Sequence, residues 1–503
     1  MNNNVELRER KNIGRNSLYI YLGKVFATIF SSLTFIYISR KLPLADYGLY
    51  SLFSAILIFL SFLLPLGFPT TMLRFIPKLV EEKNISVALY LIKKSIWIVL
   101  SSGSLFLILS FILRESLGKI FNNYELKFYL PLLMVIGGES ALAAVFKGIS
   151  NALFLQKKIT VNETVTVVAQ LLLVLLFFNL GYYLYGILIA MVIANVLLLI
   201  FYFNHLSKFM FNKFLPIADR IISKRFFRFS LKECLFMTTG YFWDITVDIF
   251  LITYILGSDY AALFGFAAFI SLFLKNWMPG LALQNLIRPL FAKSYSRNKS
   301  KEDLIYLFRF YSKLNAFCIF PVIIGMWILI GKIIVFVFGD KFLPAVDTFR
   351  ILLFFAMLQS FIRPINNLFA ILERNEIPIY ANMLIFYRLF ISLFLIKFFG
   401  IQGAAWAFGS AVLLSFLLQY SWLKKIINVN FPYIVFCKIA LNSFIMGAVV
   451  YFLRDKITNL ACLILGIITG VIIYLGISYL NKIFKSNERL LINEIIGVKI
   501  FCF

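Results

Sequence analysis

The chain consists of apolar stretches of about 20 residues that follow one another with short polar interruptions. A stretch of that length crosses the hydrocarbon core of a bilayer as a helix, which satisfies its own backbone hydrogen bonds. By this criterion we count about 14 transmembrane spans. They are expected to begin near Ser17, Tyr47, Leu91, Phe128, Ile159, Tyr183, Ser230, Tyr260, Phe308, Val346, Pro378, Gln402, Phe431 and Ile457.

Composition agrees with this pattern. Hydrophobic residues make up 61% of the chain and charged residues only 14%, and the mean hydropathy is +0.90. Soluble domains carry about 25% charged residues, so a soluble fold is excluded. We therefore predict an all-α polytopic membrane protein.

The sequence repeats itself after about 213 residues. The block Leu42–Tyr50, an apolar run, Pro65 and Arg74 recur as Leu256–Ala261, an apolar run, Pro279 and Arg288. This shift carries the first span onto the seventh, six crossings later, so both copies enter the membrane in the same orientation. The pattern predicts two six-helix repeats in parallel orientation, related by an axis along the membrane normal, plus a C-terminal helix pair without a counterpart.

The repeat also predicts the domain limits. Residues 1–205 are expected to form an N-terminal six-helix lobe and residues 206–229 a cytoplasmic basic linker. Residues 230–427 would form the C-terminal six-helix lobe, and residues 428–503 an additional transmembrane hairpin with a cytoplasmic tail.

Net charge is +26, and the basic residues gather in alternate loops rather than on one soluble face. Positive residues favour the cytoplasmic side, which predicts that both termini are cytoplasmic. Anionic lipid headgroups, and not nucleic acid, are the expected partners of that surface.

Ionisable residues inside predicted spans are costly unless they face a wet cavity or one another. Those in this chain are Lys24, Glu139, Asp244, Asp248, Lys275, Arg350, Arg363 and Arg388. The cations outnumber the acids, and several of these residues lie near the helix interruptions expected at Pro65-Leu66-Gly67 and Pro279-Gly280 in the two halves, which favours an anionic cargo. The alternative is that these groups pair internally and hold the bundle together.

Three of the acids are candidates for ion coupling. Asp244 and Asp248 are four residues apart, hence on one face of a continuous helix, where two carboxylates can bind a proton or Na⁺. Glu139 follows Gly137 and Gly138, which permit close helix approach. For each acid, a structural hydrogen bond is the competing interpretation.

Arg74 and Arg288 are related by the repeat, and each ends the second span of its half at the cytoplasmic edge. A pair of guanidinium groups there would bind a pyrophosphate by bidentate hydrogen bonds. Ordinary positive-inside anchoring is the alternative.

The chain contains no phosphate-binding loop, no His-Glu-x-x-His motif and no soluble stretch long enough for a nucleotide domain. We therefore predict a transporter without a cofactor or metal rather than an enzyme. A multidrug or cation antiporter would need an acidic, aromatic cavity. A membrane glycosyltransferase or polymerase would need catalytic carboxylates on an outer loop, where Asp340 and Asp347 lie, but nothing around them resembles a site. A structural scaffold is a third alternative.

Three blocks resemble a known family. Leu42–Tyr50, Leu66–Ile76 with its Gly67 and Arg74, and the segment from Asp248 to Gly257 are similar to polysaccharide-type (O-antigen-like) flippases. These belong to the multidrug/oligosaccharidyl-lipid/polysaccharide (MOP) exporter superfamily. The likeness runs over essentially the whole chain, with 12 core helices and an extra pair.

The resemblance implies that an isoprenoid-pyrophosphate-linked oligosaccharide crosses from the inner to the outer leaflet of a prokaryotic plasma membrane by alternating access. H⁺, Na⁺ or the membrane potential would supply the energy. The protein would act as a monomer, with glycan-assembly enzymes as candidate partners. By analogy with lipid-linked cell-wall precursor flippases, the extra pair would help form a groove for the lipid tail.

The resemblance also assigns roles to the cations. Lys24, Lys275 and Arg388 would line the cavity, while Arg74 and Arg288 would capture the pyrophosphate. Arg363 is a further candidate for substrate binding.

Overall fold

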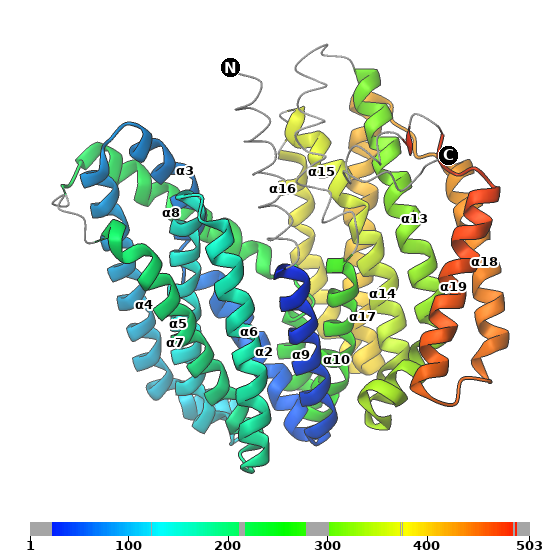
Figure 1. Ribbon diagram of the computed structural model, residues 1–503, viewed down its shortest axis with the longest axis horizontal. Helices are drawn as coiled ribbons and strands as arrows, with labels where there is room; N and C mark the ends of the chain where they lie inside the picture. The colour runs from blue at the N-terminus through cyan, green and yellow to red at the C-terminus, as the bar shows by residue number, and fades with distance from the viewer. Residues whose placement is uncertain are drawn as a thin grey trace, which may run out of the picture. The chain divides into compact units, whose positions relative to one another are not determined.

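The chain is helical throughout the part that its structure describes. A computed structural model covers the protein and describes residues 23–121, 123–210, 217–277, 301–372, 374, 376–485 and 488–489. Helices account for almost all of these residues, and no strand occurs among them (Figure 1). The predicted all-α class is confirmed.

Two compact units divide the chain, Met1–Ala262 and Leu263–Phe503. The first contains a helix over residues 23–41, α2 (Leu44–Leu63), α3 (Phe68–Glu81), α4 (Ile85–Ile120), α5 (Leu126–Ala152), α6 (Gln156–Asn179), α7 (Tyr183–Met210), α8 (Arg220–Tyr241), α9 (Val247–Leu256) and the start of α10 (Ser258–Trp277). Within it, α4, α5, α6 and α7 pack as a bundle, and α2 and α3 pack against α5.

The second unit begins inside α10. It continues with α13 (Lys301–Ile333), a π-helical turn (Ile334–Phe338), a 3₁₀ turn (Asp340–Ala345), α14 (Val346–Ser360), α15 (Ile362–Ile371), α16 (Glu376–Asn382), α17 (Leu384–Ile427), α18 (Tyr433–Arg454) and α19 (Leu460–Leu480). The division falls within α10 because α8 and α9 pack against α2, and α8 also against α3. The lobe limits derived from the repeat, 1–205 and 230–427, stay a prediction.

Eleven helices of the described residues are long and apolar enough to cross a membrane. The expected number is about 14, and three differences account for the gap. The span expected near Ser17 begins outside the described residues, the span expected near Ser230 is not among the eleven, and two expected spans are counted as one. The stretch Glu376–Ile427 counts once but covers the two spans expected at Pro378 and Gln402. Gly400, with φ 58° and ψ −140°, interrupts α17. The chain reverses there, since the Tyr387 hydroxyl lies 3.3 Å from Ser410 Oγ.

The predicted seventh span, from Ser230 onward, is wrong as one continuous helix. The α-helix stops at Tyr241 and resumes at Val247. Between them, Asp244 Oδ1 accepts hydrogen bonds from the backbone N–H (2.9 Å) and hydroxyl (2.8 Å) of Thr246. A short carboxylate that bonds nearby donors offers the backbone an alternative to the helix ladder.

The predicted interruption at Pro65-Leu66-Gly67 is confirmed. Leu66 and Gly67 have φ of 52° and 73°, the left-handed region that favours glycine. Helix α8 crosses at this point, and Ser230 Oγ donates to the Leu66 carbonyl at 2.5 Å. A Cβ at Gly67 would collide with the Ser230 carbonyl oxygen. The related Pro279–Gly280 pair lies outside the described residues.

The first unit brings the two copies of the repeated block together. Gly48 belongs to the first block, and a Cβ there would overlap the carbonyl oxygen of Ser258 in the second. Because the backbones meet this closely, glycine is required at residue 48. The corresponding residue of the second block is Ala261, which is fully buried.

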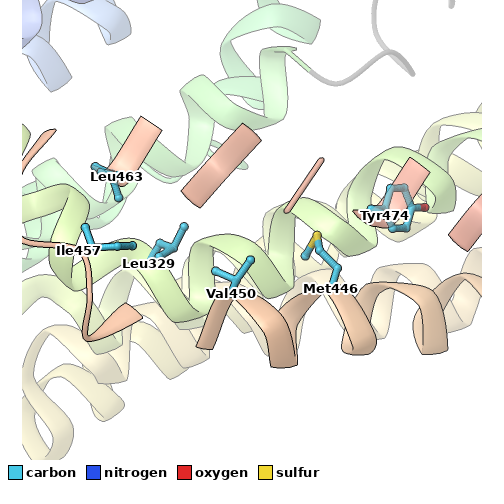
Figure 2. Close-up of a cluster of buried hydrophobic side chains, with 6 residues drawn as sticks. All are labelled: Leu329, Met446, Val450, Ile457, Leu463 and Tyr474. Carbon is cyan, nitrogen blue, oxygen red and sulfur yellow. The ribbon is translucent and has the colours of Figure 1, made fainter. Parts of the chain in front are cut away.

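The predicted C-terminal helix pair is present and packs on α13. Six buried side chains from α13, α18, α19 and the connection between α18 and α19 form its core (Figure 2). Pro321 interrupts the hydrogen bonding of α13, because proline has no N–H to donate to the Phe317 carbonyl. The Tyr474 hydroxyl of α19 donates to that carbonyl at 2.6 Å. The bond satisfies the freed acceptor and fixes α19 against α13.

The segment after α19 returns to α13 through a buried ion pair. Lys313 Nζ lies 2.7 Å from Glu488 Oε2, with the side chains 6% and 10% exposed. The Lys313 ammonium also lies 4.9 Å from the centroid of the Phe484 ring. Breaking a buried pair by removing one partner typically costs about 3–5 kcal/mol, so this contact holds the end of α19 in place.

We predict that Gly48→Ala destabilises the protein, because overpacking at a backbone contact costs about 1–3 kcal/mol. Thermal unfolding of the purified protein in detergent should show a lower midpoint than the parent. Gly240→Ala is the matched control, since a Cβ there meets no atom within 4 Å. Its midpoint should be unchanged or raised, because alanine is the better helix former. Equal midpoints for the two variants would contradict the contact.

Candidate functional site

The second unit holds three of the predicted substrate-binding cations. Lys275 of α10 donates from Nζ to Gln359 Oε1 of α14 at 3.1 Å. Arg388, in the first half of α17, is completely buried, and its Cζ lies 5.1 Å from the centroid of the Phe408 ring. Arg363 of α15 is half-buried. Contacts within the unit therefore hold the side chains of Lys275 and Arg388.

Arg350, the remaining intramembrane cation, has a structural role. Its guanidinium bonds Asp347 Oδ1 and the Trp327 carbonyl, both at 3.0 Å, and stacks 5.6 Å from the Trp327 ring centroid. It therefore ties α14 to α13. For this residue the alternative interpretation applies, in which an intramembrane charge pairs internally and holds the bundle together.

An apolar groove lies between α13, α18 and α19, which we call the hairpin groove. Its volume is about 440 Å³. It is lined by Leu274, Phe317, Cys318, Pro321, Val322, Gly325, Met326, Leu329, Ile333, Met446, Val450, Gly466, Ile467, Gly470, Val471, Tyr474 and Leu475. None of these carries a charge. Leu274 of α10, one of the lining residues, directly precedes Lys275, whose ammonium bonds Gln359 of α14.

The first unit holds two further predicted cations, Lys24 and Arg74. Lys24 is exposed on the helix over residues 23–41. Arg74 of α3 is exposed too, with its Cζ 4.4 Å from the ring centroid of Phe229 and 5.9 Å from that of Phe75. Its repeat-related partner Arg288 lies outside the described residues. Binding of a pyrophosphate by the Arg74 and Arg288 guanidinium groups therefore stays a prediction.

Glu139 lies within a polar cluster between α5 and α7. Its neighbour Ser140 accepts a hydrogen bond from Asn195 Nδ2 of α7 at 3.1 Å. Its Oε2 atom is buried and has no hydrogen-bond partner among the described residues. Gly138 faces Gly103 of α4 closely, as the glycine pattern indicated. The carboxylate thus retains a free acceptor atom inside the bundle.

Asp244 and Asp248 do not share a face of one helix, contrary to the prediction. Asp244 lies in the turn before α9 and accepts from Thr246 there. Asp248 lies in the first turn of α9 and is completely buried. The four-residue spacing could not reveal this, because the helix is interrupted between them.

Sequence reasoning missed several polar partners. Gln359 and Asn195 are single amides within apolar runs, and that isolation was a signal that they bond something across the bundle. Lys147 and Glu163 form an ion pair at 2.5 Å between α5 and α6. Among the described residues, no group of three or more His, Cys, Asp or Glu side chains could hold a metal ion.

The fold resembles solved transporters. A lipid II flippase MurJ in its inward closed conformation superposes with a TM-score of 0.71 at 17% identity, over 92% of this chain and 99% of that one. An inward-facing multidrug resistance MATE family transporter of the MOP superfamily superposes with a TM-score of 0.66 at 16% identity, over 80% of this chain and 94% of that one. A MOP superfamily transporter from Pyrococcus furiosus Vc1 superposes with a TM-score of 0.57 at 16% identity, over 83% of this chain and 95% of that one.

Identities this low establish a common fold and no more. Comparison with curated protein sequences returned no significant match. The family described as "Polysaccharide biosynthesis protein" matches residues 13–279, more than half of the 503 residues and including the repeated blocks at Leu42 and Leu256. This multi-pass membrane protein therefore belongs to the polysaccharide biosynthesis protein family.

Proposed function

We propose that the protein is a flippase that moves an isoprenoid-pyrophosphate-linked oligosaccharide from the inner to the outer leaflet of a prokaryotic plasma membrane by alternating access. The observation that carries this proposal is the hairpin groove beside Lys275. An uncharged groove accommodates an isoprenoid chain, and the cation that follows the lining residue Leu274 in the sequence would accommodate a phosphate. Membership of a polysaccharide biosynthesis family supports a glycan as the cargo.

Both termini are cytoplasmic in this proposal, following the charge of the loops. The cations Lys24, Arg74, Lys275, Arg288, Arg363 and Arg388 then serve the anionic cargo rather than an organic cation. The fold alone does not decide between these cargoes, because a multidrug transporter shares it. The sign of the interior charges of the second unit favours the glycolipid.

An ion gradient or the membrane potential would drive transport, with Glu139 as the coupling group. Its buried, unpartnered oxygen can accept a proton or coordinate Na⁺, and Asn195 and Ser140 supply neighbouring polar atoms. Asp244 already accepts two hydrogen bonds from Thr246, which makes it the weaker candidate.

We predict that Gly325→Leu lowers flipping about tenfold or more, because a leucine side chain would occupy the hairpin groove. A Cβ at Gly325 has Met446 Cε at 3.8 Å as its nearest contact, so the variant should fold. The measurement is exposure of a fluorescent isoprenoid-pyrophosphate oligosaccharide to an impermeant reagent across the membrane of reconstituted vesicles.

Gly331→Leu is the matched control for this experiment. It makes the same change on α13, where a Cβ meets nothing within 4 Å and the residue does not line the groove. The Gly331→Leu variant should flip the glycolipid at the parental rate. Equal flipping by both variants would remove the groove from the mechanism, and efflux of organic cations without any glycolipid exposure would reassign the protein as an antiporter.

The positive charge of Lys275 should contribute to glycolipid binding in addition to the hydrogen bond that Lys275 donates to Gln359. Lys275→Gln is expected to raise the glycolipid concentration needed for half-maximal flipping about tenfold, since a hydrogen bond to a charged group contributes about 1.5–3 kcal/mol. Lys275→Arg should retain most activity. Lys397→Gln, which removes an exposed lysine of α17 in the same unit, should change nothing. Parental behaviour of Lys275→Gln would show that this cation does not contact the cargo.

Replacing the coupling carboxylate should separate transport from its energy source. Glu139→Gln is expected to abolish any stimulation of flipping by an imposed H⁺ or Na⁺ gradient, because the neutral amide cannot exchange a proton or neutralise Na⁺. Glu115→Gln, at an exposed position of α4, is the control. If the Glu139 variant keeps its gradient stimulation, the coupling group lies elsewhere.

A further inference from the structure

A second apolar groove follows the opposite faces of α13 and α18. On α13, Cys318, Val322 and Gly325 line the hairpin groove, whereas Phe320, Ile323 and Trp327 line cavities on the other side. At 3.6 residues per turn these two sets point in opposite directions. The same holds on α18, where Met446 and Val450 face the hairpin groove and Phe444, Ala448 and Tyr451 face away from it.

Three neighbouring cavities make up this second groove, which we call the α18 seam. The first, of about 560 Å³, lies between α13 and α18. It shares Ile323 with the second, of about 400 Å³, which α13, α14, α17 and α18 enclose. The second shares Leu417 and Tyr420 with the third, of about 550 Å³, along α17. Because neighbouring cavities share lining residues, the three adjoin one another in series, and we describe them as one path.

The lining changes character along the path. The far end is apolar and aromatic, with Trp327, Tyr451 and Phe452 all largely exposed. In the middle, rings from four elements pack together, for example Tyr420 with Phe431 at 4.9 Å between centroids. Aromatic side chains of this kind are typical of sites that hold lipid chains near a membrane interface.

The near end, where α17 ends and α18 begins, is polar. The hydroxyls of Tyr420 and Tyr433 lie 3.2 Å apart, and Tyr420 also reaches the Val429 carbonyl at 3.4 Å. Arg309 Nε donates to the Asn430 carbonyl at 3.2 Å and so fixes the connection between the two helices. Two hydroxyl groups are thus held at the mouth of an otherwise apolar path.

Lys424 is the one charged residue among the described residues that line the three cavities, and no carboxylate lines them. It lies on the last turn of α17 at the polar end, where it is exposed. A lysine at this depth can extend its stem along apolar surface and keep its ammonium at the interface. The charge at the mouth therefore suits a negatively charged headgroup.

We propose that the α18 seam is a binding site for an anionic phospholipid. Its phosphate accepts hydrogen bonds from Lys424 and from the Tyr433 hydroxyl, and its chains lie along α13 and α18. The lipid completes the packing of the C-terminal helix pair, because α18 makes its main contacts with α13 and α19, while the cavities lie on its α14 and α17 side. This site is separate from the hairpin groove proposed for the cargo.

Thermal unfolding of the full-length protein in detergent, with added lipid, tests the proposal. Phosphatidylglycerol should raise the unfolding midpoint in a saturable way, since a ligand that binds only the native state stabilises it. Phosphatidylcholine at the same concentrations should have little effect. The assay measures binding without transport, so its result stands apart from the flippase proposal.

Neighbouring lysines provide the matched pair of variants. Lys424→Gln should raise the half-saturating phosphatidylglycerol concentration about fivefold, the effect expected for the loss of one basic residue at an anionic headgroup. Lys425→Gln, which removes the adjacent exposed lysine outside the cavities, should leave it unchanged. Both positions are exposed, so neither change should prevent folding.

A second pair tests the apolar part. Ala448→Trp would fill the cavity between α13 and α18 and should abolish the lipid effect, whereas Ala461→Trp, exposed on α19 outside the seam, should retain it. Equal stabilisation by phosphatidylcholine, or equal responses of the two lysine variants, would overturn the proposal. Stabilisation by an isoprenyl pyrophosphate but not by phosphatidylglycerol, lost in Lys424→Gln, would instead assign the seam to the cargo.

Discussion

The structure depends on one constraint, the absence of water inside a bilayer, which forces every backbone N–H and C=O to find a partner within the protein. Where the helices are interrupted, other groups supply the missing bonds. Ser230 donates to the carbonyl of Leu66 at the break between α2 and α3. Tyr474 donates to the carbonyl that Pro321 leaves without a partner in α13. Each repair also joins two helices that are far apart in the sequence.

Three kinds of contact hold the C-terminal helix pair, α18 and α19, against α13. The hydroxyl bond to α13, the buried core of Figure 2 and the Lys313–Glu488 ion pair act along the length of α19 and beyond its end. The pair then leaves two apolar surfaces on α13 and α18, one beside Lys275 and one ending at Lys424. In our proposals the first takes the cargo and the second a structural lipid, so the same two helices serve transport and stability.

Both units contain ionisable residues to which we assign a role, and Lys24 and Arg74 belong to the first unit. Lys275, Arg363 and Arg388 lie in the second unit, whereas Glu139 lies in the first. Arg350, which composition alone could not distinguish from the other cations, ties α14 to α13. Identifying which buried charge is structural therefore needs its bonding partners, and a count of charges cannot replace them.

Hydrophobicity and the repeat were sufficient to determine the all-α membrane class, the C-terminal pair and the break at Gly67, because bilayer thickness and glycine's left-handed conformation act locally. They also singled out most of the ionisable residues discussed above. The tertiary structure decided what local spacing could not. It interrupted the helix between Asp244 and Asp248, reversed the chain at Gly400, and gave Lys275 its partner Gln359. These outcomes depend on contacts between residues distant in sequence, which a periodic pattern along one helix does not record.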